Sequence, residues 1–380
     1  MEPRENPFAP GAGCLPPALV GRDKLLEEAD ILFTRVMKGL SSKSMLLHGL
    51  RGVGKTVLLL RMGDMAKEHG FHVVNYESID GAAALPFMVQ SLRRILLNMG
   101  GKAKHALKVL ASYVKTLRLG SIEVGIDVAE GYADSGNPEQ DCIDVFTAVG
   151  EAAKEKKTGI VLIIDEIHML DKRDFSILSM VIHKMQQLNL PVIMIAAGLP
   201  ILVRLVGHAK TYAERLFSIH SIGHLSEEQS NEALTVPLKE KSVSIDPETL
   251  HLIYVNTLGY PYFLQEWGYK LWNVANSPSI CREDAIVAAA EVQERLDTAF
   301  YRVRYERLTP KEIKFMRGMA QIQGERISMT DLATALKTRV SSLSTTRERL
   351  IVKGMIYSPE RGYIAYSVPM FGAYLRRIKD

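Results

Sequence analysis

The sequence is poor in cysteine and has no long apolar run. Its three cysteines, Cys14, Cys142 and Cys281, are far apart in a chain of 380 residues, so neither a disulfide framework nor a zinc site is indicated. No apolar run approaches the roughly 20 residues that a membrane-spanning helix needs. The first residues also lack the basic and then apolar pattern of a signal peptide. We therefore expect a protein of the reducing cytoplasm that has no membrane partner.

Charge is distributed unevenly along the chain. Residues 301–380 carry 16 Lys and Arg against 7 Asp and Glu, a net charge of +9. The other 300 residues carry 31 against 36, a net charge of −5, so the formal total of +4 hides the asymmetry. A basic C-terminal segment favours a polyanionic partner, and ordinary solvated surface charge is the alternative. The length and the 47% hydrophobic content are typical of a globular protein of two or three domains.

One octapeptide matches the pattern G-x-x-x-x-G-K-[ST] of a phosphate-binding P-loop. It consists of Gly49-Leu50-Arg51-Gly52-Val53-Gly54-Lys55-Thr56. Apolar stretches predict a buried strand at 44–48 and a helix after the loop, an arrangement in which backbone N–H groups point at an anion. Gly52 and Gly54 let the backbone approach the phosphates, where a Cβ atom would collide. We expect Lys55 to reach the β- and γ-phosphates and Thr56 to bind Mg²⁺.

A second motif supplies carboxylates. Five consecutive aliphatic residues, 160–164, are followed by Asp165 and Glu166. Such a run predicts a strand buried on both faces, and the carboxyl end of that strand is where α/β sheets bind their ligands. Asp165 is expected to hold Mg²⁺, and Glu166 to orient or deprotonate the attacking water.

Strands and helices alternate over the first part of the chain. Further strands are predicted at 71–76, 121–128 and 192–197, and helices at 23–40, 83–98, 102–117, 139–156 and 172–188. This alternation predicts an α/β fold with a parallel, doubly wound sheet. The proline-rich residues 1–18 are expected to form a flexible arm, so the P-loop domain would span 19–222.

The strand signals stop at about residue 225. Helices are predicted at 226–235, 247–257, 261–275 and 282–302, and then at 310–321, 328–336 and 340–353, before two short strands at 355–358 and 363–368 and a helix at 369–378. The first group predicts a helical lid domain, residues 223–303. The second group predicts a winged helix-turn-helix domain, residues 304–380.

Together these features resemble the AAA+ ATPases, above all the initiator-type branch (origin-recognition and Cdc-type proteins) and the related STAND and archaeal-type ATPases. Val20-Gly21-Arg22 resembles the VGR box that these families place beside the adenine. Gly259-Tyr260-Pro261 matches their GxP motif, in which the proline, here Pro261, packs on the base. The resemblance implies that the cofactors are ATP and Mg²⁺, and ATP hydrolysis is the implied activity.

Arg215 falls where AAA+ proteins carry the arginine finger that reaches a neighbour's γ-phosphate. Such a finger implies a homo-oligomer, because it acts in trans; a surface ion pair is the alternative.

Two departures from the family pattern predict slow hydrolysis. The strand at 192–197 is followed by Gly198 instead of the usual Asn, Ser or Thr, and the helix after Pro261 begins without an arginine. His168 is either a γ-phosphate sensor or a loop histidine.

In a winged helix the third helix enters the major groove of DNA. The residues predicted to contact nucleic acid are Arg339, Ser342, Thr346, Arg347, Arg349 and, at the wing tip, Arg361. The first hypothesis is therefore an ATP-switched protein that binds duplex DNA. The alternative is a STAND-type signalling ATPase whose winged helix binds a protein partner. A metabolic kinase is disfavoured, because a helical lid and a winged helix have no role there.

Overall fold

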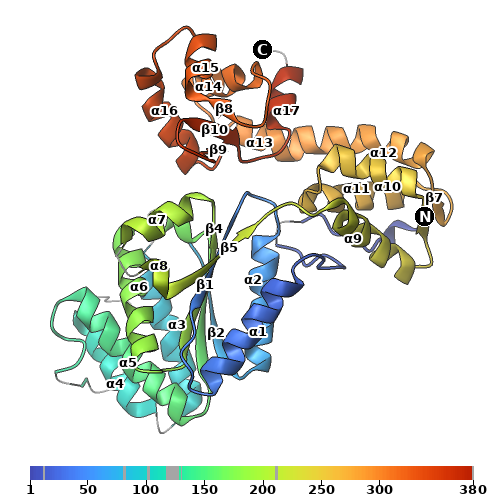
Figure 1. Cartoon of the computed structure of the whole chain (residues 1–380). Coiled ribbons are helices and arrows are strands. Elements are labelled where there is room, and N and C mark those ends of the chain that lie inside the picture. The colour runs from blue at the N-terminus through green and yellow to red at the C-terminus, as the bar shows by residue number, and fades with distance from the viewer. Residues whose placement is uncertain are drawn as a thin grey trace. The chain divides into compact units, whose positions relative to one another are not determined.

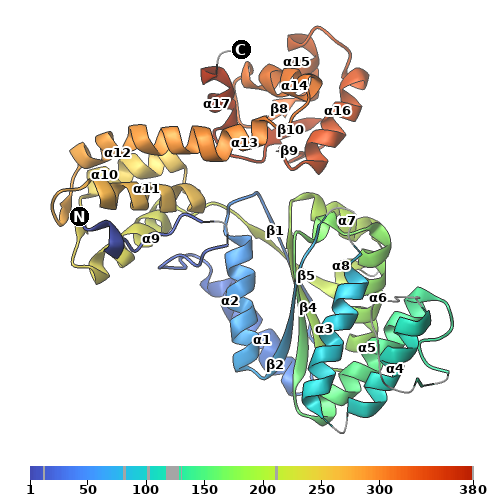
Figure 2. The ribbon, with the colours of Figure 1, turned by 180° about the vertical axis from the view of Figure 1, so that it is seen from behind.

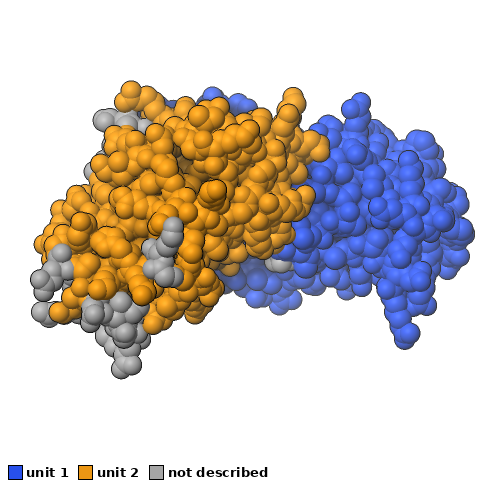
Figure 3. Space-filling model, turned by 90° about the horizontal axis from the view of Figure 1, so that it is seen from below, with its two compact units in different colours: residues 1–21, 50–54, 223–380 blue, residues 22–49, 55–222 orange. Residues whose placement is uncertain are grey.

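The computed structural model describes residues 1–11, 13–79, 83–100, 103–116, 128–129, 131–209 and 213–378. Most of the strand predicted at 121–128 lies outside the described residues. The chain forms two compact units (Figure 3): the sheet unit, residues 22–49 and 55–222, and the helical unit, residues 1–21, 50–54 and 223–380. In the described part of the chain, no helix combines the length and the apolar character needed to cross a membrane.

The sheet unit alternates strands with helices, as the sequence predicts. Its elements are α1 (Asp23–Met37), β1 (Ser44–Gly49), α2 (Lys55–Glu68), β2 (Phe71–Glu77), α3 (Ala84–Met99), α4 (Lys104–Thr116), α5 (Pro138–Glu155), β3 (Gly159–Asp165), η3 (Ile167–Met169), α6 (Lys172–Gln187), β4 (Val192–Gly198), α7 (Ile201–Ala209), α8 (Ala213–Leu216) and β5 (Phe217–Ile222). The strands form a parallel sheet in the order β2-β3-β4-β1-β5. This architecture confirms the predicted α/β class.

Helices cover both faces of this sheet (Figures 1 and 2): α1 and α2 lie on one face, and α3 to α7 lie on the other. The aliphatic side chains of β3 pack on both faces of the sheet, because successive side chains of a strand point to opposite faces. Ile160, Leu162 and Ile164 lie in the core under α3, α5 and α6, whereas Ile163 faces Gly63 of α2. All five strands end at one edge of the sheet, which brings the end of β1 and the end of β3 to either side of β4.

The helical unit holds a group of helices followed by a winged helix. Its elements are η1 (Pro3–Glu5), α9 (Glu227–Glu240), β6 (Ser244–Ile245), α10 (Pro247–Thr257), α11 (Pro261–Val274), β7 (Ser279–Ile280), α12 (Arg282–Arg295), the π-helical η4 (Leu296–Tyr301), α13 (Arg302–Tyr305), α14 (Pro310–Ala320), β8 (Ile327–Ser328), α15 (Met329–Ala335), α16 (Val340–Val352), β9 (Ile356–Tyr357), β10 (Tyr363–Tyr366) and α17 (Phe371–Arg377). The helix starts follow local chemistry: Ser226 and Thr309 make capping boxes, and proline opens α10, α11 and α14.

The winged helix has the predicted composition. The helices α14, α15 and α16 are followed by the hairpin β9–β10, and β8 joins the hairpin to give an antiparallel sheet in the order β8-β10-β9. The hairpin turn ends at Gly362, whose φ of +85° suits glycine. Tyr301 of η4 stacks on Tyr374 of α17, with ring centroids 5.1 Å apart, and so joins the end of the lid to the winged helix.

The N-terminal segment differs from the flexible arm expected there, because several of its groups pack on α11. The indole N–H of Trp272 donates to the carbonyl of Glu2 at 2.8 Å, and the Asn6 side chain donates to the carbonyl of Tyr269 at 3.0 Å. Phe8 is 2% exposed and lies where a Cβ atom on Gly268 would be 2.6 Å from its ring. The physical reason is a buried aromatic side chain, which the proline content of the segment does not reveal.

Candidate nucleotide-binding site

The P-loop occupies the connection between β1 and α2. Gly52 and Gly54 have φ angles of +80° and +91°, a region that residues with a Cβ atom rarely adopt. Val53 between them is 1% exposed. The loop therefore has the backbone that the motif requires, with a helix starting at Lys55 and the helix N-terminus favouring an anion.

Lys55, Thr56 and Asp165 converge at the carboxyl edge of the sheet. The Lys55 ammonium group is buried and donates to the carbonyl of Gly49 at 3.1 Å. The Thr56 hydroxyl donates to Asp165 Oδ2 at 2.6 Å, and Asp165 Oδ1 accepts from the N–H of Glu166 at 2.8 Å. A hydroxyl and a carboxylate in contact fit Mg²⁺, which prefers oxygen ligands and keeps phosphate and water in its shell. Thr56 and Asp165 are thus the residues that would hold the ion, and the ion would neutralise phosphate charge.

Glu166 lies in a strained turn directly after β3. Its φ is +50°, a left-handed conformation that is uncommon outside glycine and is often found at functional sites. One Glu166 carboxylate oxygen is 3.3 Å from Nδ1 of His168, whose side chain is 3% exposed. The N–H of Leu199 also points at this nitrogen, at 3.3 Å. The turn thus orients the carboxylate that is expected to act on water.

The side chain of His168, in η3, lies beside the end of β4. This is the position where the sequence lacks the expected Asn, Ser or Thr. A Cβ atom on Gly198 would be only 3.2 Å from His168 Nδ1. Gly198 therefore leaves room for the imidazole of a residue that follows the neighbouring strand. The sequence alone favours a loop histidine over a γ-phosphate sensor at His168, and the absence of a side chain at Gly198 is the signal that indicates a place beside Glu166.

A second histidine borders the loop. Burial lowers the pKa of His48, and the charges of Lys55 and His220 lower it further. The imidazole is therefore neutral at pH 7, so it adds no positive charge next to Lys55. Lys55 remains the buried cation that is expected to reach the phosphates.

The residues of the two tripeptides, Val20-Gly21-Arg22 and Gly259-Tyr260-Pro261, occur next to helix starts. Arg22 is 9% exposed and is the N-cap of α1, and Pro261 is the first residue of α11. Gly21 lies against Gln229, 2.7 Å from where its Cβ atom would be. The carbonyl of Gly259 accepts from the N–H of Leu225 at 2.9 Å. A glycine of each tripeptide therefore contacts the chain at the start of α9.

The residues predicted to contact DNA divide into two sets. Arg339, Ser342, Arg349 and Arg361 are exposed. Thr346 is 4% exposed, and this prediction is wrong because Thr346 shares the buried face of α16 with Leu343 and Leu350 at helical spacing.

Two predicted arginines have different surroundings. The guanidinium group of Arg347 donates to the Ser358 hydroxyl at 2.9 Å and so ties α16 to the wing. Arg215 is exposed on α8, immediately before the edge strand β5, which the sequence did not predict.

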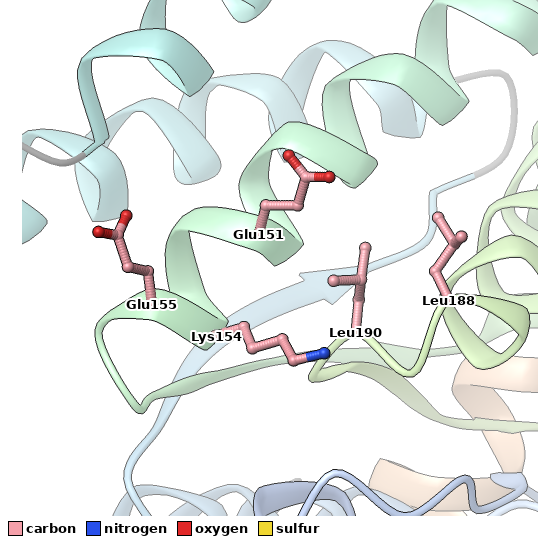
Figure 4. A pocket seen from close by; sticks show the side chains of 5 residues that line it. All are labelled: Glu151, Lys154, Glu155, Leu188 and Leu190. Atoms are coloured by element: carbon pink, nitrogen blue, oxygen red, sulfur yellow. The ribbon is translucent and has the colours of Figure 1, made fainter.

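The sheet unit also has a shallow hollow of about 400 Å³ that is lined by Glu151, Lys154, Glu155, Leu188 and Leu190 (Figure 4). These residues come from the end of α5 and from the segment before β4. They lie at the amino ends of the parallel strands, on the opposite edge of the sheet from the P-loop. The hollow is therefore no part of the nucleotide site.

These contacts define a P-loop nucleoside triphosphatase. The family profile described as the AAA ATPase domain matches residues 18–195, and a domain of unknown function matches residues 298–375. The N-terminal part of the chain is therefore an AAA ATPase domain, and the protein is an ATPase. The chain matches none of the curated proteins.

Several solved structures are similar to this chain at low sequence identity, and the first of the three below shares its fold. A Walker-type ATPase of Pyrococcus abyssi is 15% identical with a TM-score of 0.58, and the match covers 94% of this chain and 96% of that one. Cdc6p of Pyrobaculum aerophilum is 15% identical with a TM-score of 0.49, over 97% and 96% of the two chains. Orc1 of Aeropyrum pernix, in complex with DNA, is 15% identical with a TM-score of 0.47, over 95% and 93%.

Proposed function

We propose that the protein is an ATP-dependent switch that binds duplex DNA through its winged helix and hydrolyses ATP slowly. In this proposal residues 19–222 bind and hydrolyse Mg·ATP, residues 223–303 form the lid, and residues 304–380 bind DNA. The observation that carries the proposal is the exposed polar and basic side of α16, continued by Arg361 at the wing tip, in a segment of net charge +9. Arginine at these positions suits phosphates and guanine edges.

Adenine recognition is assigned to the residues next to the two helix starts. Val20, Gly21 and Arg22 would border the base, and Pro261 would pack on it. Support comes from the packing of Gly21 and Gly259 at the start of α9. A glycine-rich border leaves room for the flat face of an aromatic base, which packs through shape.

Slow hydrolysis follows from how few groups act on the transition state. The helix α11, PYFLQEWGYKLWNV, contains no arginine, and its one lysine, Lys270, pairs with Glu291 at 2.8 Å. At the end of β4 the polar group is His168, which already contacts Glu166. Each missing donor to the developing charge reduces the rate.

Arg215 is proposed as a residue that completes the ATPase site of a neighbouring copy. Its exposure on α8 supports that role. The Arg215→Ala variant is expected to bind ATP as the parent does but to lose about 10³-fold in hydrolysis rate. Mixing it with a Lys55→Ala variant should restore part of the activity, because the second protein supplies the arginine. Activity that is independent of protein concentration and unchanged in Arg215→Ala would contradict the proposal.

DNA binding is tested by fluorescence anisotropy with a labelled duplex, with Mg·ATP, Mg·ADP or no nucleotide, over a salt series. Contacts to about six phosphates should weaken binding by ~10³ or more between 50 and 200 mM salt. The double variant Arg349→Ala/Arg361→Ala is expected to weaken binding and to reduce the salt slope by about two.

Lys311→Ala/Lys314→Ala is the matched control, since it removes the same charge from exposed positions of α14. Equal losses in both double variants would indicate general electrostatic attraction. No binding in any nucleotide state, by a folded protein that still binds ATP, would overturn the DNA-binding role.

One observation favours a second function, docking of the winged helix on a protein. Val340 and Val352 of α16 are 42% and 58% exposed, and Tyr363 of the wing is 40% exposed. Apolar groups beside the basic ones suit a protein partner, for which binding falls little with salt. The same salt series therefore separates the two functions.

A further inference from the structure

The turn between β9 and β10 carries Arg361 at its tip. The N–H of Tyr363 donates to the carbonyl of Glu360 at 3.2 Å and so closes a turn of four residues, 360–363, which we call the wing turn. Arg361 and Gly362 are its two central residues, and Arg361 is exposed. The φ of +85° at Gly362 is the conformation that the third position of a type II turn requires. The backbone that carries Arg361 therefore has a defined shape.

The hydroxyl group of Ser358 lies between the two ends of the wing turn. Its oxygen is 2.9 Å from the carbonyl oxygen of Glu360 and 2.9 Å from that of Tyr363, and its single proton can be donated to either. The same hydroxyl oxygen accepts from Nη2 of Arg347 in α16, at 2.9 Å. Because a hydroxyl that accepts from a cation is polarised, it becomes a stronger donor to its own acceptor. A chain of hydrogen bonds therefore runs from α16 through Ser358 to the wing turn.

The guanidinium group of Arg347 is more enclosed than those of the basic residues near it. Arg347 is half-buried, whereas Arg349 and Arg361 are exposed. Its Nε is buried and has no hydrogen-bond partner within the part of the chain that the structure describes. This nitrogen is therefore closed to a ligand, and the group is placed to join two elements of the winged helix.

Two further contacts reach the wing turn from β8 and its neighbouring residues. The N–H of Met329 donates to the carbonyl of Gly362 at 2.9 Å. Nη1 of Arg326 lies 3.4 Å from Oε1 of Glu360, and both of these side chains are more than half exposed, so the pair contributes little. Neither contact involves α16. The hydrogen-bond chain through the serine hydroxyl is thus what relates the wing turn to that helix.

We propose that Arg347 is a positioning residue for DNA binding, which fixes the wing turn and Arg361 relative to α16 through Ser358. The inference rests on the proposed DNA-binding function and deepens it. In that function the exposed residues of α16 and Arg361 contact one duplex together. Two contacts held at a fixed separation bind a stiff duplex better than two that move independently, because less of the loop has to be ordered on binding. Arg347 acts on DNA binding in this way without touching the DNA.

The test measures the duplex affinity of the full-length protein by fluorescence anisotropy, over the same salt series. Ser358→Ala removes a hydroxyl and no charge, and it is expected to weaken binding about fivefold, the cost of ordering one loop side chain. Arg347→Ala should weaken binding by the same factor. The double variant Arg347→Ala/Ser358→Ala should bind no more weakly than either single variant, because both changes break one chain of hydrogen bonds. Ser358→Thr keeps the hydroxyl and should bind as the parent does.

The salt dependence separates positioning from direct contact. An arginine that contacts a phosphate contributes about 0.9 to the slope of log K against log salt concentration, so Arg349→Ala is expected to lower the slope by that amount. Arg347→Ala and Ser358→Ala should keep the parental slope to within about 0.3. Arg326→Ala is the matched control, since it removes an arginine beside the wing turn and leaves the hydrogen-bond chain intact. Its affinity should stay within about twofold of the parent.

Separate outcomes identify separate failures. A parent protein that binds no duplex in any nucleotide state would overturn the DNA-binding function, and the positioning role with it. A parent that binds, with Ser358→Ala at the parental affinity, would overturn the positioning role alone. A slope lowered by about 0.9 in Arg347→Ala, with losses that add in the double variant, would show that Arg347 contacts a phosphate itself.

Hydrogen exchange in the DNA-free protein measures the hydrogen-bond chain directly. The amide of Tyr363, which donates within the wing turn, should exchange several-fold faster in Ser358→Ala and Arg347→Ala than in the parent or in Arg349→Ala. Equal exchange in all four proteins would contradict the role given to Ser358. Thermal melting shows which variants are folded, and Ser358→Ala keeps the test decisive if Arg347→Ala is unstable.

Discussion

Lys55→Ala is expected to weaken Mg·ATP binding by about a hundredfold or more. The ammonium group is buried beside the Gly49 carbonyl, so its charge would act on bound phosphates with little screening. Charge-assisted hydrogen bonds contribute about 1.5–3 kcal/mol each, and Lys55 would contribute to two phosphates. Calorimetric titration with Mg·ATPγS measures the loss.

Thermal stability provides an independent readout of the same loss. At about 100 times the Kd, ATP should stabilise the parent by ~2.7 kcal/mol, which is about 5–10 °C in Tm. The variant should show a shift of at most about 1.5 °C at the same concentration. Lys67→Ala is the control, since Lys67 is on the same helix α2 and pairs with Asp64 at 2.8 Å on the surface. A full ATP-dependent shift in Lys55→Ala would refute the assignment of the loop.

Glu166→Gln is expected to lower kcat by about 10²–10⁴-fold while ATP affinity stays within about threefold. Glutamine keeps the shape of the side chain and its contact with His168 but cannot take a proton from water, and loss of a general base costs this much. Single-turnover hydrolysis of radiolabelled ATP gives the sensitivity that a slow enzyme needs.

The matched control for this variant is Glu151→Gln, in the hollow at the opposite edge of the sheet. It should hydrolyse ATP at the parental rate. Hydrolysis by Glu166→Gln within threefold of the parent would show that another group activates the water. His168 would then be examined first, because it lies against both Glu166 and the end of β4.

Local sequence was enough for the P-loop and for the acidic end of β3. Glycines at φ angles of +80° and +91°, a lysine at the helix start and an uninterrupted aliphatic strand are each required by nearby backbone geometry, so a short sequence pattern predicts them. The helix starts at Ser226, Asp246 and Thr309 can be predicted from the sequence for the same reason, since a capping side chain acts within one turn of the helix.

Other elements depended on distant partners. The edge strand β5 is a strand because it pairs with β1, and α7 and α8 lack a strong local signal. Thr346 was misassigned because its polarity suggested the surface, whereas its spacing from Leu343 and Leu350 places it on the buried face of α16. The Phe8 ring packs on Gly268 of α11, which lies far away in the chain.

The sequence by itself determined the class of protein, a P-loop ATPase with an α/β sheet, and that a lid and a winged helix follow. These follow from periodicity, caps and glycine placement, which act over a few residues. Only the tertiary structure decided which polar groups meet across the chain, as His168 meets Gly198 and Tyr260 meets Gly52. Such contacts join residues whose separation leaves no pattern, because packing of whole elements sets them and local preference does not.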